Sequence, residues 1–219
     1  MIKISPSILS ADFARLGEEC ARICGAGADL LHVDVMDGCF VPNLTIGAPV
    51  IRCIKPYSSV PLDVHLMIDR PERYLDDFVT AGASIVTVHA EATQKIDEIL
   101  ARLSASGVKA SLSIKPDTPS EVVFPYLDRL AMVLVMTVDP GFAGQQIIPA
   151  VFEKIKKVRE MVYQSGKEID IQVDGQVNEN SAQKLVECGA NVLVLGSSGL
   201  FKFDPSEYNE AVTKYKSLL

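Results

Sequence analysis

The chain has 219 residues, 48% of them hydrophobic, and a formal net charge of -7. This length can bury one large core, so we expect a single domain over residues 1–219. The acidic balance and the absence of a basic patch argue against nucleic acid as a partner. No apolar run approaches the roughly 20 residues of a membrane span, and the N-terminus lacks a signal-peptide pattern. The sequence therefore predicts a cytoplasmic protein with no membrane partner.

Eight short apolar runs recur along the chain. Most are apolar at both odd and even positions, which is typical of parallel strands covered on both faces. The predicted strands are Ile2–Ile8, Leu30–Met36, Leu62–Met67, Ile85–His89, Lys109–Ile114, Met132–Val138, Ile169–Asp174 and Val192–Gly196.

Helical spacing of apolar residues appears between these runs. The predicted helices include Asp12–Ile23, Pro71–Thr80, Val151–Tyr163 and Asn180–Glu187. In the first of them, Phe13, Leu16, Cys20 and Ile23 fall on one face. Glycines that follow a helix and precede the next strand are predicted C-cap residues, namely Gly27, Gly82, Gly107 and Gly189.

The regular alternation of strand and helix predicts a (β/α)8 TIM barrel. The alternative is an open doubly wound sheet, which typically has fewer strands. Acidic residues, histidines and glycine-rich turns all fall at the carboxyl ends of the predicted strands. Because barrel active sites are built at that end, the barrel is favoured.

Five scattered cysteines are predicted to be reduced thiols in or near the core. Their number is odd, and no CxxC pair occurs among them. They are Cys20, Cys24, Cys39, Cys53 and Cys188.

Two histidines and two aspartates form the first candidate site. His32 and Asp34 lie two residues apart in "LLHVDVMDG", so they point to the same side of their strand. His65 in "LDVHLM" and Asp174 in "IQVDGQV" end two other strands. This donor set predicts one divalent metal ion, and Zn, Mn, Co and Fe all tolerate it. His89 has no clear partner, and we interpret it as structural or as a support for the ligands.

Glycine-containing turns form the second candidate site. They follow the sixth, seventh and eighth strands as Asp139–Gln145, Asp174–Val177 and Gly196–Phe201. Barrels often bind phosphate at the last two of these loops, at the start of a short helix. Three methionines at strand ends are predicted to line the same cavity, with core packing as their alternative role. They are Met36, Met67 and Met136.

Several segments closely resemble the ribulose-phosphate 3-epimerase family over nearly the whole chain. They are "PSILSADF", "LHVDVMDGCFVPNLTIG", "DVHLM", "MTVDPGFAGQ", "VDG" and "GSSGLF". The resemblance implies a TIM barrel, a divalent metal and an isomerase that interconverts ketose phosphates differing at C3. A sugar phosphate is then the small-molecule partner, and a homo-oligomer is expected.

The same resemblance implies roles for particular residues. The metal ligands fall on His32, Asp34, His65 and Asp174, and the acid–base pair falls on Asp34 and Asp174. The substrate contacts fall on Ser7, His65, Gly141, Phe142, Ala143, Gly144, Gly175, Gln176, Gly196, Ser197 and Ser198.

The loops depart from the commonest pattern of that family. Asp139, Ala143 and Gln176 replace the usual residues, and "GSSGLF" replaces the usual last loop. The sixth and eighth loops look like the allulose-6-phosphate 3-epimerase branch, whereas "PSILSADF" looks like the pentose enzyme. We therefore lean to D-allulose 6-phosphate and D-fructose 6-phosphate as substrates. The alternative is D-ribulose 5-phosphate and D-xylulose 5-phosphate in the pentose phosphate pathway.

Two remote alternatives come from other functional classes. A barrel decarboxylase commonly has a D-x-K-x-x-D pattern, but Met36 stands where its lysine would fall. A non-catalytic sugar-phosphate-binding barrel would have no need of two acids at one metal.

Overall fold

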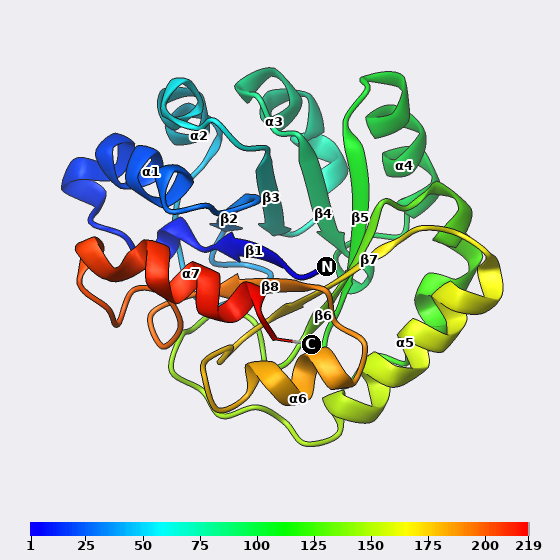
Figure 1. Ribbon diagram of the computed structural model, residues 1–219. Coiled ribbons are helices and arrows are strands. Elements are labelled where there is room, and N and C mark those ends of the chain that lie inside the picture. The colour runs from blue at the N-terminus through cyan, green and yellow to red at the C-terminus, as the bar shows by residue number, and fades with distance from the viewer. Residues whose placement is uncertain (219) are drawn as a thin grey trace.

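An eight-stranded parallel sheet forms the centre of the computed structural model, which describes residues 1–218 (Figure 1). Its strands are β1 (Lys3–Pro6), β2 (Leu31–Met36), β3 (Leu62–Met67), β4 (Ile85–His89), β5 (Lys109–Ile114), β6 (Met132–Met136), β7 (Asp170–Asp174) and β8 (Val192–Leu195). The strand order runs from β1 through β8 back to β2. A parallel bridge between Ser7 and His32 joins the two ends. The predicted (β/α)8 barrel is confirmed.

Helices surround this sheet on the outside (Figure 1). They are α1 (Leu16–Gly25), α2 (Ala48–Ile54), α3 (Leu75–Ala81), α4 (Ile96–Ala105), α5 (Val151–Ser165), α6 (Ala182–Glu187) and α7 (Tyr208–Lys216). The connection from β5 to β6 is instead a run of 3-10 turns, η6 (Ser120–Arg129), with Pro125 inside it. Proline has no N–H to donate, which favours short turns over a continuous α-helix.

The first predicted helix begins later than expected. The Asp12 side chain accepts a hydrogen bond from the Ala14 amide and caps a 3-10 turn, so α1 starts only at Leu16. Phe13 lies in that turn and is 47% exposed, which corrects its predicted place on the buried face. The four predicted C-cap glycines all have positive φ, from 70° to 114°.

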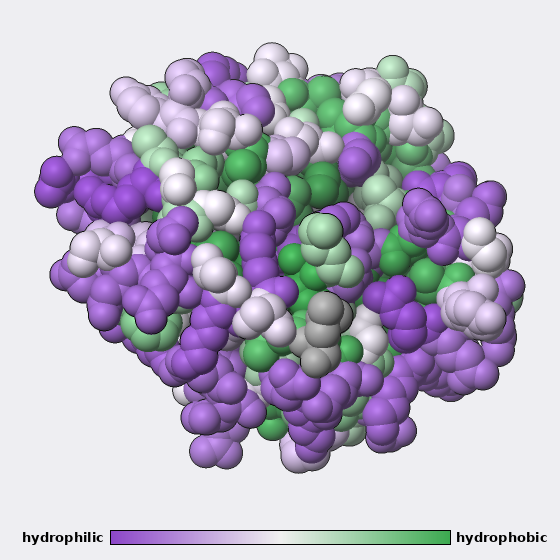
Figure 2. Space-filling model, in the orientation of Figure 1, coloured by the Kyte–Doolittle hydropathy of each residue, from purple (hydrophilic) through white to green (hydrophobic). Residues whose placement is uncertain are grey.

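The core lies between the sheet and the helices. Hydrophilic residues cover most of the face seen in Figure 2, as expected when helices turn their apolar stripes toward a sheet. No helix among residues 1–218 is long and apolar enough to cross a membrane. All five cysteines are free, but Cys39 and Cys53 are exposed, so the prediction that they lie in or near the core was wrong for these two.

The side chains inside the barrel change from apolar to polar toward the carboxyl ends of the strands. Leu30, Ile85, Met132 and Val192 form an apolar cluster at the amino-terminal end of the strands. One step further along, a buried polar set replaces it. This set consists of Ser5, Asp63, Ser111 and Gln172. The carboxyl ends of the strands therefore project side chains above a polar floor.

Candidate active site

The four predicted metal ligands meet at the carboxyl end of the barrel. His32 and Asp34 come from β2, His65 from β3 and Asp174 from the end of β7. Each residue offers one ligand atom, and these atoms all lie within 4.8 Å of one another. Asp34 Oδ1 lies 3.2 Å from His32 Nε2 and 3.1 Å from His65 Nδ1. Asp174 Oδ2 lies 3.9 and 3.8 Å from the same two nitrogens.

A buried carboxylate determines which nitrogen of His32 faces the cluster. His32 Nδ1 lies 2.8 Å from Asp63 Oδ2, which also accepts hydrogen bonds from Ser5 and Gln172. Because a carboxylate only accepts, Nδ1 donates and Nε2 keeps its lone pair. His32 Nε2 is buried and has no hydrogen-bond partner among residues 1–218. In the neutral ring this lone pair faces two carboxylates, and a proton or a metal cation between them would satisfy all three groups.

The cluster fits a divalent first-row metal ion. Metal–ligand bonds are about 2 Å long, so ligand atoms around one ion lie about 3 Å from one another. The distances of 3.1 to 3.9 Å between ring nitrogens and carboxylate oxygens are close to that spacing. Two imidazoles and two carboxylates suit Zn, Mn, Co and Fe alike.

The two carboxylates of the cluster have opposite proton affinities. Burial opposes ionisation of Asp34, but His32 and His65 hold the pKa of its carboxyl well below the usual range. Burial and the nearby charge of Asp34 raise the pKa of Asp174 to about 6. One carboxyl is therefore ionised while the other binds a proton readily, which is the arrangement of an acid–base pair.

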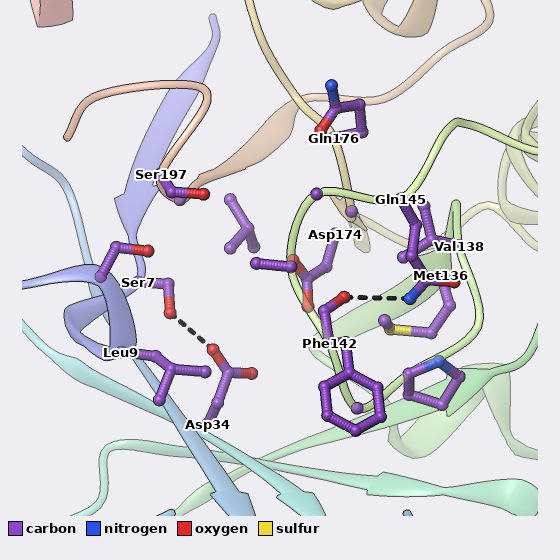
Figure 3. Close-up of a pocket in the computed structure, with 18 of the residues that line it drawn as sticks. Ser7, Leu9, Asp34, Met136, Val138, Phe142, Gln145, Asp174, Gln176 and Ser197 are labelled. Carbon is purple, nitrogen blue, oxygen red and sulfur yellow. Dashed lines mark hydrogen bonds between the residues drawn. The ribbon is translucent and has the colours of Figure 1, made fainter. Parts of the chain in front are cut away.

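A pocket opens directly above the cluster (Figure 3). Asp34 and Asp174 reach into it, together with Ser7, whose hydroxyl donates to Asp34 Oδ2 at 2.5 Å. His65, also predicted as a substrate contact, is fully buried and does not line this pocket. The other predicted contacts and wall residues do line it, namely Ser7, Gly141, Phe142, Ala143, Gly144, Gly175, Gln176, Gly196, Ser197, Ser198, Met36, Met67 and Met136.

Some lining residues were not predicted as substrate contacts. Gln145, in the predicted turn after β6, braces that loop, because its amide donates to the carbonyls of Asp139 and Phe142 at 2.6 and 2.9 Å (Figure 3). No motif marks such a role, since the turn itself creates its partners. Asp139, Pro140 and Val177 also lie in the predicted turns, whereas Leu9, Ser10, Val138 and Val194 lie outside them.

The loops after β7 and β8 present backbone to the pocket. Gly175 has φ 112°, and a Cβ there would lie 2.6 Å from Val138 Cγ2, so only glycine fits. Residues 197–201 form turns after β8. The amides of Ser197 and Ser198 donate to no acceptor in the part of the chain that the structure describes. These groups can therefore bind an anion.

His89 has partners that its sequence position did not reveal. Its Nε2 lies 2.9 Å from His65 Nε2, and its Nδ1 lies 3.2 Å from Glu91 Oε2. Burial lowers the pKa of His89 to about 4, so its ring is neutral at neutral pH. Glu91 comes one turn after the end of β4, which explains why strand periodicity alone could not identify it.

The fold and the site define a barrel enzyme whose pocket holds two carboxylates in a cluster that could bind a metal ion. A model described as the ribulose-phosphate 3 epimerase family matches residues 3–201. The chain is 49% identical over 199 residues to ribulose-phosphate 3-epimerase of Bacillus subtilis (strain 168), covering 90% of this chain and 92% of that protein. It is 43% identical over 217 residues to ribulose-phosphate 3-epimerase of Escherichia coli (strain K12), covering 99% and 95%. The chain belongs to the ribulose-phosphate 3-epimerase family, and the prediction of a carbohydrate epimerase is confirmed.

A solved structure supports the fold independently. A mutant tryptophan synthase alpha-subunit from Pyrococcus furiosus superposes with a TM-score of 0.70 at 15% identity, covering 99% of this chain and 96% of that one. At that identity the likeness concerns the fold alone.

Proposed function

We propose that the protein interconverts D-ribulose 5-phosphate and D-xylulose 5-phosphate by inverting the configuration at C3. Relatives 43% and 49% identical over nearly the whole chain are named ribulose-phosphate 3-epimerase, which supports the five-carbon alternative. The lean to six-carbon sugars has no such support. Two of the residues behind it, Asp139 and Ala143, are exposed in the loop after β6.

The acid–base pair is the observation that carries the proposal. Inversion at C3 requires a base on one face of the carbon and an acid on the other. Asp34 on β2 and Asp174 on β7 reach the pocket from different strands (Figure 3). Ionised Asp34 takes the C3 proton, protonated Asp174 delivers one to the opposite face, and the roles exchange in the reverse direction.

The surroundings of the pair adapt it to this task. Ser7 fixes the free oxygen of Asp34 through its 2.5 Å hydrogen bond, so that oxygen keeps one direction. The thioethers of Met36, Met67 and Met136 limit water near the reacting carbon. A divalent metal bound by the two histidines and two aspartates would stabilise the negative charge that develops beside C3.

The phosphate has a separate binding place. We assign it to the backbone amides of Gly175, Gln176, Ser197 and Ser198, which follow β7 and β8 and line the pocket. Amide groups bind an anion without a positively charged side chain, so the net charge of -7 is no obstacle. No lysine of residues 1–218 lines this pocket, which argues against a decarboxylase.

The sugar is tested by comparing kcat/KM for ribulose 5-phosphate and allulose 6-phosphate on one preparation. One hydroxyl or methylene contact is worth roughly 1–3 kcal/mol, so we expect a preference of about tenfold or more for the five-carbon sugar. A preference of the same size for the six-carbon sugar would reject the proposed substrate, while the assignment as an epimerase would stand. Turnover of neither sugar would reject the proposed reaction.

A further inference from the structure

A chain of hydrogen bonds leads from the candidate metal site to the end of β4 and the turn after it, which do not line the pocket. It runs from His65 Nε2 to His89 Nε2 at 2.9 Å, and from His89 Nδ1 to Glu91 Oε2 at 3.2 Å. Both histidines are fully buried. The direction of each bond depends on which nitrogens carry protons, and Glu91 determines that direction.

Glu91 is held as an acceptor. Its Oε1 accepts the Lys115 amide at 2.8 Å and also the Thr118 hydroxyl. Although burial opposes ionisation, hydrogen bonds from His89, Lys115 and Thr118 lower the pKa of Glu91 to about 2. An ionised carboxylate only accepts, so the proton of a neutral His89 lies on Nδ1.

The remaining bonds follow from that proton. With its proton on Nδ1, the neutral His89 ring can only accept at Nε2. His65 Nε2 therefore donates, and His65 Nδ1 keeps a lone pair. This lone pair points toward Asp34 Oδ1 and Asp174 Oδ2, at 3.1 and 3.8 Å.

We propose that His89 and Glu91 are a positioning pair that fixes His65 in the Nε2–H tautomer and presents its Nδ1 to a divalent metal. Asp63 acts in the same way on the opposite nitrogen of His32. The loop that holds Glu91 is itself anchored, because Lys154 Nζ donates to the Lys115 carbonyl at 2.9 Å and to the Thr118 carbonyl at 2.5 Å. The inference rests on the proposed function, since it requires the proposed metal site.

The variant Glu91→Gln reverses the polarity of this chain at nearly constant volume. The Lys115 amide can only donate, so it retains the oxygen of the new side chain and leaves the NH2 group facing His89. His89 must then accept at Nδ1 and carry its proton on Nε2, opposite the Nε2–H of His65. His65 is driven to the Nδ1–H tautomer, which cannot bind a metal through that nitrogen.

Two measurements test the inference without relying on turnover. Cobalt(II) titration of the metal-stripped protein, followed by visible absorption, should show affinity 10- to 100-fold weaker for Glu91→Gln. Nitrogen-15 NMR of histidine-labelled apoprotein should show His65 with Nε2–H in the wild type and Nδ1–H in the variant. Glu91→Asp, which keeps an acceptor-only group, should recover most of the affinity.

Glu121→Gln is the matched control. It changes an exposed glutamate on η6 and should leave cobalt affinity unchanged. Wild-type affinity and tautomer in Glu91→Gln would overturn the inference, as would an Nε2–H proton on His89 in the wild-type apoprotein. Unchanged cobalt affinity in His65→Ala would instead overturn the proposed metal site.

Discussion

Asp34 and Asp174 are identical side chains whose surroundings give them opposite roles. Asp34 accepts a hydrogen bond from the Ser7 hydroxyl, and without a metal the protonated forms of the two neighbouring imidazoles favour its ionised form. Asp174 has fewer partners and faces the charge of Asp34, so burial and repulsion raise its pKa to about 6. A two-base mechanism needs this asymmetry at the start of each turnover.

Replacing either aspartate by asparagine should prevent proton transfer at one face of C3. Asp34→Asn and Asp174→Asn should each lower kcat by at least about 10² to 10⁴, with added loss from the damaged metal site. In heavy water the wild type should place solvent deuterium at C3 of the product, measured by NMR. Asp128→Asn, an exposed change on η6, is the control and should keep wild-type kcat. Direct transfer of the original C3 hydrogen without exchange would contradict the two-base mechanism.

Gln176 is a second residue whose environment matters more than its side-chain chemistry. Its φ is 49°, in the left-handed region that favours glycine, and Figure 3 shows it across the pocket from Asp34. The Ser181 hydroxyl donates to its carbonyl at 2.8 Å and helps to hold this conformation. This backbone conformation is one that glycine adopts without strain.

Gln176→Gly should leave the free energy of unfolding within about 1 kcal/mol of wild type, because relief of backbone strain offsets the greater freedom of the unfolded chain. Gln183→Gly, at the second residue of α6, should cost up to about 1 kcal/mol, since glycine is a poor helix former. Urea unfolding of the two variants measures both values. A loss above 2 kcal/mol in Gln176→Gly would show that the side chain, not the backbone, stabilises the turn.

At the scale of elements, the strands could be predicted from the sequence better than their connections. The bounds of β3, β4 and β5 match the predicted runs, because buried parallel strands must be apolar along their length. The first predicted strand, Ile2–Ile8, is longer than β1. After Pro6 only the isolated Ser7–His32 bridge continues the pairing, and a 3-10 turn begins at Ile8. The four residues of the candidate metal cluster could be predicted because strand ends and strand period bring them together. The His89–Glu91 contact was not, because a turn after β4 creates it.

Helix α5 stabilises the loop after β5 through one lysine. Lys154 Nζ donates to the carbonyls of Lys115, Pro116 and Thr118, and the side chain is half-buried. Lys154→Met should lower the free energy of unfolding by about 1–3 kcal/mol, because these carbonyls lose a charged donor. Lys157→Met, one turn along on the exposed face, should cost at most about 1 kcal/mol, since it breaks only a surface ion pair with Glu121. Equal losses in urea unfolding would show that the loop does not depend on Lys154.

At the scale of the whole molecule, the seam between β1 and β2 has the least regular strand pairing of the barrel. Every other neighbouring pair shares a ladder of at least two registered positions. In the part of the chain that the structure describes, β1 and β2 are joined by the isolated Ser7–His32 bridge and by hydrogen bonds from the Asp29 and Leu30 amides to the Ile4 carbonyl. The candidate metal ligands come from β2, β3 and β7, so a bound ion would connect opposite sides of the barrel beside that seam.

Metal removal should therefore lower thermal stability as well as activity. An ion present at 100 times its dissociation constant stabilises the folded state by about 2.7 kcal/mol, if it does not bind the unfolded chain. For a chain of this size, 1 kcal/mol shifts Tm by about 2–4 °C, so a chelator should lower Tm by about 5–10 °C in calorimetry. Readdition of Mn, Co or Zn should restore it, while His65→Ala should show a low Tm that neither chelator nor metal changes. A wild-type Tm unaffected by chelator in a preparation proven metal-free would show that the barrel closes without the ion.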